Sequence, residues 1–525
     1  MCSLTSLLVL GLLCVAVRLN AVDEFRFASY YGDHMVLQKV PERAVLWGYG
    51  STGSKVIVSL VGEQGSRAEQ AVSVQNGIWR VTLDPVKAGG PYNLTAIQQD
   101  AARAQVTLTD VLFGDVWLCG GQSNMAMTLS QVFNASEEQA LAPKYPHVRI
   151  FMAALEHSDE PLMDLARVEV PWSVPSPELV GGPAFTHYSA VCWLFGRYLY
   201  KILGYPVGLV ESCWGGTPVE AWSSTRALQK CGLEKQEKVD SSYLYLPGRL
   251  PLLPGWMSQF MLTWKKSILW NAMIHPLLNM TIKGAIWYQG EANTNYNLLK
   301  YACSFPAMID DWRATFHEGS GGQTAADFPF GFVQISTDVK SSQSESFPIL
   351  RWQQTAGYGF APNPRMKNTF MAVALDLPDE TSRWGSIHPR DKQDVAYRLT
   401  LGARAVAYGE KGVSFQGPFP AKVLLSGDSI NITYTQAVSV TPSKSVFEIC
   451  CTQEKTPCRS NSTWLPAPIM QWGGRYIQVS VSMCENVVSG LRYAWRDWPC
   501  NFKACPVYSA DRELPAPPFT VNRWP

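Results

Sequence analysis

The spacing of hydrophobic and polar residues divides the chain into three stretches with different periods. From Phe25 to about Thr109, short runs such as AVLWGYG, KVIVSLVG and IWRVTLD are bounded by Gly, Pro, Asn or Asp. Short runs between turn-forming residues are typical of the strands of a small antiparallel sandwich. We therefore expect a β-sandwich-like domain over residues 22–110.

From Val111 the pattern changes to continuous apolar runs that alternate with helical stretches. VLFGDVWLC, VGLVESCW, IKGAIWYQ, FPFGFVQIS and TFMAVALD are the apolar runs, and AVCWLFGRYLYKIL has the period of a helix. Strands buried on both faces and joined by helices predict an α/β fold with a parallel sheet. We assign residues 111–412 to this domain, with an insertion at about 234–265 where the period is lost.

Short strand-like runs return after Gly412 and predict a β-rich region over residues 413–525. This region holds six cysteines, namely Cys450, Cys451, Cys458, Cys484, Cys500 and Cys505. Their spacing matches no zinc finger, so we interpret them as disulfide-bonded rather than metal-binding.

The N-terminus predicts entry into the secretory pathway. LLVLGLLCVAV, over residues 7–17, has the length of the apolar core of a signal peptide and is too short to span a membrane. Cleavage after Ala21 would remove residues 1–21 and leave 11 of the 13 cysteines, so at least one thiol is unpaired. Asn-x-Ser/Thr glycosylation sequons begin at Asn93, Asn134, Asn279, Asn431 and Asn461.

Composition and motifs exclude several classes of function. The formal net charge is +1 and no run of Lys or Arg occurs, so we expect no nucleic acid or anionic membrane as a partner. No other apolar stretch reaches about 20 residues, so we expect no membrane span. HExxH, Walker and GxGxxG motifs are absent, and we expect neither a metal nor a cofactor. The 19 Trp residues would suit sugar binding and a large core equally well.

One stretch, GDVWLCGGQSNM, raises the question of why two glycines precede a serine. Ser123 would begin a helix after a buried strand, where free backbone N–H groups collect. Such a serine is either a helix cap or a nucleophile. Because ligands bind at the carboxyl ends of parallel strands, the residues that follow the other strands decide between the two.

Residues after the other strands complete the set that acyl transfer needs, namely Gly215 and Gly216, Gln289 and Glu291, and Asp376 and His388. A serine nucleophile needs a base, and of the seven histidines His388 lies in a loop between a core strand and a helix. His147 and His157, which flank a possible strand, are the next candidates. The Ser123 N–H, a glycine N–H and the Gln289 amide could stabilise an oxyanion.

Four blocks, GDVWLCGGQSNM, WGGTPVEAW, WYQGEAN and IHPRDKQDVAYR, together resemble the sialate O-acetylesterase family of SGNH-type serine hydrolases. The resemblance extends over most of the chain. It implies a flavodoxin-like sheet and removal of O-acetyl groups, chiefly 9-O-acetyl, from sialic acids and sialoglycoconjugates. It implies Ser123 as nucleophile, His388 as base, and Gln289 with a glycine of WGG in the oxyanion hole. It also implies a lysosomal location, with secretion as the alternative.

The chain departs from the SGNH pattern before the histidine. Hydrolases of this type commonly carry an Asp two or three residues earlier, where this chain has Ser386 and Gly385. One alternative is a Ser–His dyad in which a backbone carbonyl holds the imidazole. The other is an acid supplied from elsewhere to orient the ring. The candidate acids are Asp376, Asp379 and Asp391.

Three further alternatives stay open at this point. Glu291 is expected to be a structural hydrogen-bonding residue, because an SGNH site needs no second carboxylate. The enzyme could act on other acetylated carbohydrates, since related folds do so. The chain could also be a sugar-binding protein with an inactive site, although the complete set of Ser123, Gln289 and His388 argues against it.

Overall fold

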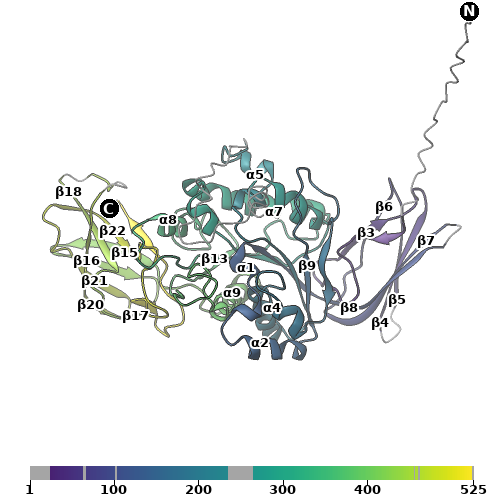
Figure 1. The fold of residues 1–525 in the computed structure, drawn as a ribbon, viewed down its shortest axis with the longest axis horizontal. Coiled ribbons are helices and arrows are strands. Elements are labelled where there is room, and N and C mark those ends of the chain that lie inside the picture. Colours follow the sequence, from purple (N-terminus) through teal and green to yellow (C-terminus); the bar gives the residue numbers. More distant parts are fainter. Residues whose placement is uncertain are drawn as a thin grey trace, which may run out of the picture.

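The computed structural model describes residues 24–62, 67–100, 103–234, 264–453, 456–458 and 462–522. The predicted signal peptide, Asn461 and nearly all of the predicted insertion lie outside these residues. Three parts lie in a row along the long axis of the molecule (Figure 1). An N-terminal β-rich part is at one end, an α/β part is in the middle, and a C-terminal β-rich part is at the other end.

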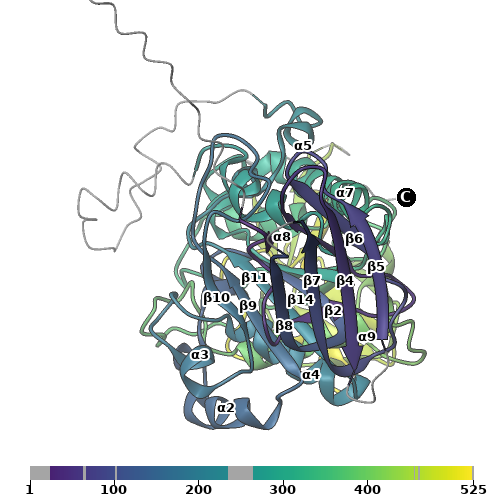
Figure 2. The ribbon, with the colours of Figure 1, turned by 90° about the vertical axis from the view of Figure 1, so that its right-hand side faces the viewer.

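The N-terminal part is built from short strands on two sheets. One sheet has the order β1-β3-β6, and β4 pairs with both β5 and β7 in the other. Figure 2 shows β4, β5 and β7 side by side, in front of the strands of the central part. The strands are β1 (Arg26–Phe27), β2 (Val36–Gln38), β3 (Val45–Tyr49), β4 (Lys55–Gly62), β5 (Arg67–Ser73), β6 (Ile78–Thr82) and β7 (Gly89–Gln99).

A single long strand, β8 (Gln105–Gly121), joins the N-terminal part to the central part. Its first half pairs with β7, and its second half lies between β11 and β12. The boundary predicted between residues 110 and 111 therefore falls inside a strand. The change of period in the sequence marks where β8 becomes buried on both faces, not where the chain leaves one sheet for another.

The central sheet confirms the predicted α/β architecture. Its order is β10-β9-β11-β8-β12-β13-β14, and the strands are parallel except for β10 at one edge. Besides β8, the strands are β9 (Val148–Ala153), β10 (Val168–Ser173), β11 (Val207–Cys213), β12 (Gly284–Tyr288), β13 (Phe330–Gln334) and β14 (Thr369–Val373). Because β9 and β11 to β14 are buried along their whole length, helices must cover both faces.

Helices pack on each face of this sheet (Figure 1). On one face α4 packs against α9, and α7 covers the other. The helices are α1 (Ser123–Ala126), α2 (Ala135–Leu141), α3 (Pro177–Gly181), α4 (Ala190–Leu203), α5 (Thr225–Gln229), α7 (Tyr301–Gly319), α8 (Ser346–Gln353) and α9 (Lys392–Val406). No helix in the described residues is long and apolar enough to cross a bilayer.

The C-terminal part consists of short strands around its own apolar core. One sheet has the order β15-β16-β21-β20, another has β19-β18-β22-β24, and β17 pairs with β23. The strands are β15 (Pro420–Ser426), β16 (Ser429–Tyr434), β17 (Val438–Val440), β18 (Phe447–Thr452), β19 (Trp464–Pro466), β20 (Ile469–Gly473), β21 (Tyr476–Ser480), β22 (Val487–Tyr493), β23 (Val507–Ser509) and β24 (Phe519–Val521).

Disulfides join strands and helices in two of the three parts. The C-terminal cysteines form Cys450–Cys458, Cys451–Cys484 and Cys500–Cys505, which confirms the disulfide interpretation. In the central part, Cys119–Cys192 joins β8 to α4 and Cys231–Cys303 joins the end of α5 to α7. Among the described residues one free cysteine remains, the buried Cys213. Such pairing is typical of proteins that pass through the secretory pathway.

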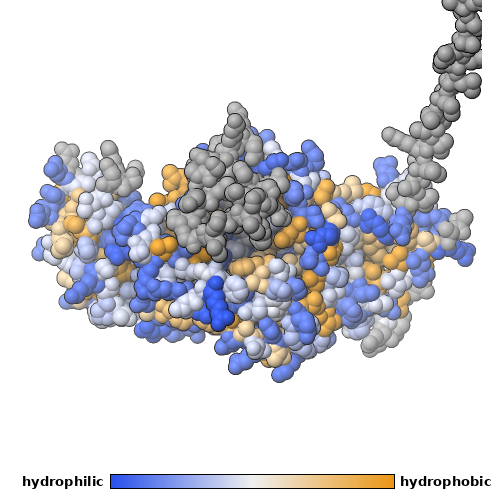
Figure 3. Space-filling model, viewed as in Figure 1, coloured by the Kyte–Doolittle hydropathy of each residue, from blue (hydrophilic) through white to orange (hydrophobic). Residues whose placement is uncertain are grey.

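The predicted glycosylation sequons differ in exposure. The side chains of Asn93 and Asn134 are exposed, whereas those of Asn279 and Asn431 are half-buried. Asn279 also accepts a hydrogen bond from Arg80 at 2.7 Å. On the face shown in Figure 3, hydrophobic and hydrophilic residues are interspersed over all three parts.

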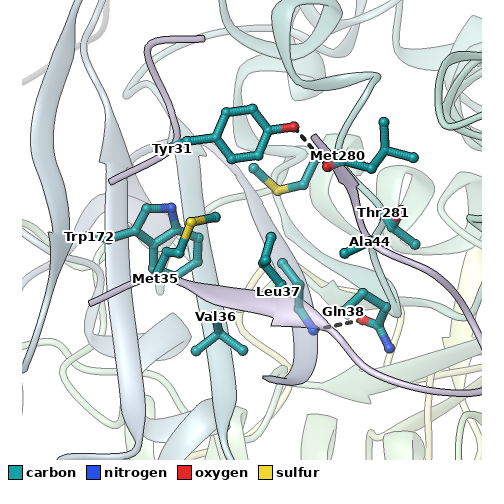
Figure 4. A pocket seen from close by; sticks show the side chains of 11 residues that line it. Tyr31, Met35, Val36, Leu37, Gln38, Ala44, Trp172, Met280 and Thr281 are labelled. Carbon is teal, nitrogen blue, oxygen red and sulfur yellow. Dashed lines mark hydrogen bonds between the residues drawn. The ribbon is translucent and has the colours of Figure 1, made fainter. Parts of the chain in front are cut away.

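A small cavity lies between the N-terminal part and the central sheet (Figure 4). Its volume is about 10 Å³, and its lining includes Met35, Leu37 and Trp172. A space of this size holds about one water molecule and no sugar. The cavity borders Val116, five residues before the carboxyl end of β8, so a substrate site must lie elsewhere.

Candidate active site

Two glycines at the end of β8 allow the chain to turn beside β12. A side chain on Gly121 would overlap the backbone carbonyl of Tyr288, and Gly121 has a φ of +144°. A Cβ on Gly120 would lie 2.9 Å from a ring carbon of Trp287. The Gly-Gly pair is therefore required by space and by backbone conformation. It delivers Ser123 to the first position of α1, at the carboxyl edge of the sheet.

The structure brings Ser123 and His388 into direct contact. The Ser123 Oγ lies 2.8 Å from Nε2 of His388, although 265 positions separate the two residues. His388 lies between β14 and α9, and the Phe185 ring is 5.2 Å from its ring. Its Nδ1 lies 2.7 Å from the carbonyl oxygen of Trp384. A carbonyl only accepts, so Nδ1 carries the proton and Nε2 can accept from the serine hydroxyl.

The aspartates considered as a third member of the site bind elsewhere. Asp376 is fully buried and receives two hydrogen bonds from Arg398, at 2.6 and 2.9 Å. Asp391 caps the N-terminus of α9 through the Asp394 N–H and pairs with Lys503 at 2.9 Å. The expected supporting role of these two carboxylates at the imidazole is therefore wrong, because other cations and N–H groups already bind them.

Asp379 lies between β14 and α9, as Asp376 does, and it is also bound by an arginine. The Arg390 guanidinium donates to both of its carboxylate oxygens, at 2.6 and 2.9 Å. Burial alone would raise the pKa of the Asp379 carboxyl, but the hydrogen bonds from Arg390 outweigh it and lower that pKa. Asp379 therefore stabilises the loop around His388 as an anion held by arginine.

The backbone of a second loop passes close to Ser123. A Cβ on Gly215 would lie 3.3 Å from the Ser123 Cβ, so the backbone of this loop passes directly beside the serine. Gly216 has a φ of +73°, a conformation that favours glycine. Within the described part of the chain, no hydrogen-bond acceptor is bound by the N–H groups of Ser123, Gly215 or Gly216. These are the free donors that an oxyanion needs.

Gln289 has a different role from the one predicted. Its Nε2 donates to the carbonyl of Thr217 at 3.2 Å and to Oδ1 of Asn293 at 2.8 Å. Its Oε1 accepts from the Tyr301 hydroxyl at 2.9 Å. Both amide hydrogens are used, so the expectation that this amide donates to the oxyanion is wrong. The fully buried side chain instead holds the Gly215–Thr217 turn in place.

Behind Ser123 lies a buried chain of polar side chains. Asn124 donates from Nδ2 to Oε1 of Glu291 at 2.6 Å and accepts at Oδ1 from the Lys392 ammonium at 2.7 Å. Burial raises the pKa of the Glu291 carboxyl, and burial lowers the pKa of Lys392 to about 7. Glu291 thus lies in the site as a hydrogen-bonding residue, in line with the expectation from sequence.

Two residues of the site, Trp384 and Lys392, could not be identified from the sequence. Trp384 acts through its backbone carbonyl, which any residue could supply. Lys392 is an ordinary lysine in IHPRDKQ, and only the fold shows that it is fully buried. Asn124 is part of the GGQSN block, so its position next to the nucleophile was a usable signal.

This chain matches a family model and several relatives of known name. The family model of the sialate O-acetylesterase C-terminal domain matches residues 421–523. The chain is 49% identical to the sialate O-acetylesterase of Homo sapiens over 521 residues, covering 98% of this chain and 95% of the relative. The Rattus norvegicus sialate O-acetylesterase is 49% identical over 537 residues, covering 98% of this chain and 97% of the relative.

A solved structure is similar over nearly the whole length. The crystal structure of a carbohydrate acetylesterase from Xanthomonas citri matches with a TM-score of 0.74 at 28% identity, covering 95% of this chain and 100% of that one. The arrangement of the three parts is therefore shared with an experimentally determined protein.

Proposed function

Because this chain belongs to the sialate O-acetylesterase family, we propose that it hydrolyses O-acetyl esters of sialic acids through a covalent acetyl-enzyme on Ser123. The substrates are free sialic acids and sialoglycoconjugates, with the 9-O-acetyl ester as the chief one. The observation that carries the proposal is the contact of Ser123 Oγ with His388 Nε2 at 2.8 Å, with Nδ1 held by a carbonyl.

The first half of the reaction transfers the acetyl group to the enzyme. Nε2 of His388 takes the hydroxyl proton as Ser123 Oγ attacks the acetyl carbonyl carbon. The tetrahedral intermediate then collapses, the bond to the sugar oxygen breaks, and His388 gives its proton to that oxygen. The sugar leaves with a free hydroxyl group, and Ser123 carries the acetyl ester.

The second half releases acetate. His388 removes a proton from water, the resulting hydroxide attacks the acetyl carbon, and the proton returns to Ser123 Oγ as the ester bond breaks. The imidazolium formed in both halves is stabilised by the Trp384 carbonyl, which accepts from Nδ1. The site is thus a Ser–His dyad with a backbone carbonyl in the place of an aspartate.

The N–H groups of Ser123 and Gly215, and that of Gly216, are the donors for the oxyanion. Gln289 holds the loop that presents the two glycines, through the Thr217 carbonyl. In Gly215→Ala the added methyl group would press on Ser123, and we expect kcat to fall by about 10 to 100-fold.

The proposal also covers the topology of the central sheet, the cellular location and the glycosylation sites. The order β11-β8-β12-β13-β14 matches the 2-1-3-4-5 order of flavodoxin-like sheets, which supports an SGNH-type catalytic domain over about residues 111–412. The disulfides support a lysosomal or secreted protein that bears glycans at the exposed sequons Asn93 and Asn134.

The test is acetate release from 9-O-acetylated sialic acid by the glycosylated full chain. We expect Ser123→Ala and His388→Ala each to lose about a thousandfold or more of kcat. His317→Ala is the matched control, because His317 also contacts a backbone carbonyl, that of Thr324, and should keep full activity. Full activity of Ser123→Ala would refute the mechanism.

A second candidate function is deacetylation of other carbohydrates, and the similarity to the Xanthomonas citri enzyme favours it. Acetylated xylo-oligosaccharide, assayed beside the sialate, separates the two. A higher kcat/KM for the plant-type substrate would favour the second candidate. If the wild-type chain binds the sugar but neither substrate loses acetate, the protein is a sugar-binding one.

A further inference from the structure

A fully buried lysine lies next to the proposed nucleophile and has no part in the acetyl transfer described above. Lys392 is the first residue of α9, four positions after His388, and none of its surface is exposed. Its ammonium is 5.0 Å from the centre of the Tyr288 ring. Burying a cation is costly unless it is hydrogen-bonded and paired with negative charge. Such a group is retained only where its contacts matter.

The ammonium binds an amide in place of a carboxylate. Lys392 donates to Oδ1 of Asn124 at 2.7 Å, and the same amide donates to Oε1 of Glu291 at 2.6 Å. Below its pKa of about 7 Lys392 is a cation, and its charge and that of the Glu291 carboxylate then lie on the two sides of one neutral group. All three residues are at least nine-tenths buried, so water does not weaken these interactions.

The second amide hydrogen reaches the loop that carries the base. Asn124 Nδ2 also donates to the backbone carbonyl of Ile387, at 2.9 Å. Ile387 immediately precedes His388, and Asn124 immediately follows Ser123. One side chain thus connects the helix that begins with Ser123 to the loop that contains His388.

The charges on either side leave the amide a single orientation. If it turned over, its oxygen would face the Glu291 carboxylate and the Ile387 carbonyl. Its NH₂ group would face the Lys392 ammonium, so all three contacts would be repulsive. Lys392 and Glu291 together therefore fix the direction in which Asn124 donates.

We propose that Asn124, Lys392 and Glu291 form a positioning unit that holds Ser123 and His388 in register for proton transfer. The proposal rests on the proposed function, since it takes Ser123 as nucleophile and His388 as base. None of the three residues touches the reacting atoms. Their contribution is to keep the Oγ to Nε2 distance short during both halves of the reaction.

The unit makes a specific kinetic prediction. In Asn124→Ala the loop and the helix lose their connection, and we expect kcat to fall by about 100-fold while KM changes by less than about threefold. Glu291→Gln keeps an acceptor for Asn124 and should retain kcat within about fivefold.

A reversed hydrogen bond separates positioning from simple structural support. Asn124→Asp places a carboxylate against Glu291 and should lose as much kcat as Asn124→Ala. Adding Glu291→Gln lets the new amide donate to the new carboxylate, with Lys392 still donating on the other side. The carboxylate at position 124 still cannot donate to the Ile387 carbonyl, so the double variant should regain melting temperature while its kcat stays within about threefold of that of Asn124→Asp.

The experiment measures kcat and KM with p-nitrophenyl acetate, on samples whose folded fraction is known from thermal melting. Asn363→Ala is the matched control, because Asn363 is a buried asparagine with two carbonyl contacts, located before the amino end of β14. It should lower the melting temperature without changing kcat. The rate of Ser123 labelling by a fluorophosphonate provides a second readout that needs no turnover.

The outcomes are distinct. Asn124→Ala with unchanged kcat and labelling rate, or with a change in KM alone, would overturn the positioning unit. So would a double variant that recovers kcat at least about tenfold over Asn124→Asp. If wild type hydrolyses the aryl ester but not acetylated sialic acid, the proposed substrate fails and the positioning unit is still tested. Loss of kcat in Asn124→Ala, with recovery of melting temperature but not of kcat in the double variant, supports it.

Discussion

Two buried groups of charges involve residues near the two ends of the His388 loop, Asp376 and Lys392, and they are built differently. Asp376 and Arg398 meet directly, through two hydrogen bonds at 2.6 and 2.9 Å. Lys392 and Glu291 are separated by the Asn124 amide. The direct pair ties β14 to α9, and Tyr508 of the C-terminal part also donates to Asp376 at 3.0 Å.

The difference shows what each arrangement can do. A direct ion pair fixes two elements against each other but contributes nothing to the base, because both partners are used up. An amide between two charges has a direction, and its spare hydrogen can bind a third group. We therefore infer that the first group of charges holds the fold and that the second holds the site.

Asp376→Asn should have the largest effect on stability. It leaves the buried Arg398 guanidinium with only the more distant carboxylate of Asp394, at 3.7 Å, and we expect a loss of about 3 to 5 kcal/mol in the free energy of unfolding. Urea denaturation measures this loss. The kcat per labelled Ser123 should stay within about threefold of wild type.

A matched control exists in the C-terminal part. Glu448 pairs with Arg492 at 2.8 Å, and both side chains are nearly as buried as the Asp376 pair. Glu448→Gln leaves Arg492 with the Glu345 carboxylate at 2.6 Å, so it should cost somewhat less stability and leave kcat per site unchanged. If Asp376→Asn lowers kcat a hundredfold while Glu448→Gln does not, Asp376 acts on the base and the comparison is wrong.

Lys392→Met should change how stability depends on pH. Burial lowers the pKa of Lys392 to about 7 despite the nearby carboxylates of Glu291, Asp391 and Asp379. Between about pH 7 and pH 10 the unfolded chain then binds more protons at this residue than the folded chain, so this lysine makes wild-type stability rise with pH. The variant lacks this rise.

The measurement is the free energy of unfolding of both proteins from pH 7 to pH 9. The stability of wild type relative to Lys392→Met should increase by about 2 kcal/mol over this interval. Parallel curves would mean that Lys392 keeps its ordinary titration, and the contrast between the two groups of charges would lose its physical basis.

Asp379→Asn should have the smallest effect. Its partner Arg390 is partly exposed, so solvent weakens the pair, and we expect a loss of about 1 kcal/mol. The kcat should fall by less than about tenfold, because the contacts between Asp379 and Arg390 support the loop around His388 and do not involve its imidazole. Urea denaturation and acetate release test this together. A loss as large as that of Asp376→Asn would contradict the ranking by burial.

Much of the architecture could be predicted from the sequence, because periodicity reports burial directly. The apolar runs that became β11, β12, β13 and β14 are buried on both faces, as their lack of alternation indicates. The predicted boundary at residues 110 and 111 falls inside β8, because this strand changes its surroundings without a break. A single strand can be half-exposed at one end and fully buried at the other.

The site was predictable in part, for a related reason. Groups at the carboxyl ends of parallel strands converge on one edge, so Ser123, Gly215 and His388 could be placed together. Gln289 was at the right edge, but its donors bind Thr217 and Asn293 in place of the oxyanion. Which acceptor an amide binds depends on distances of a few tenths of an ångström, which spacing along the chain does not contain.

By itself, the sequence determined the alternation of strands and helices, the glycine turn before Ser123, the choice of His388 and the disulfide-rich C-terminal region. These follow from residue size, backbone freedom and hydrophobic period, which are local properties. Only the tertiary structure decided that the Trp384 carbonyl contacts the His388 imidazole, that Asp376 is bound by arginine, and that Lys392 is buried beside Asn124. The roles of carbonyls and charges depend on which partners the fold brings within hydrogen-bond distance, and those partners come from remote positions in the chain.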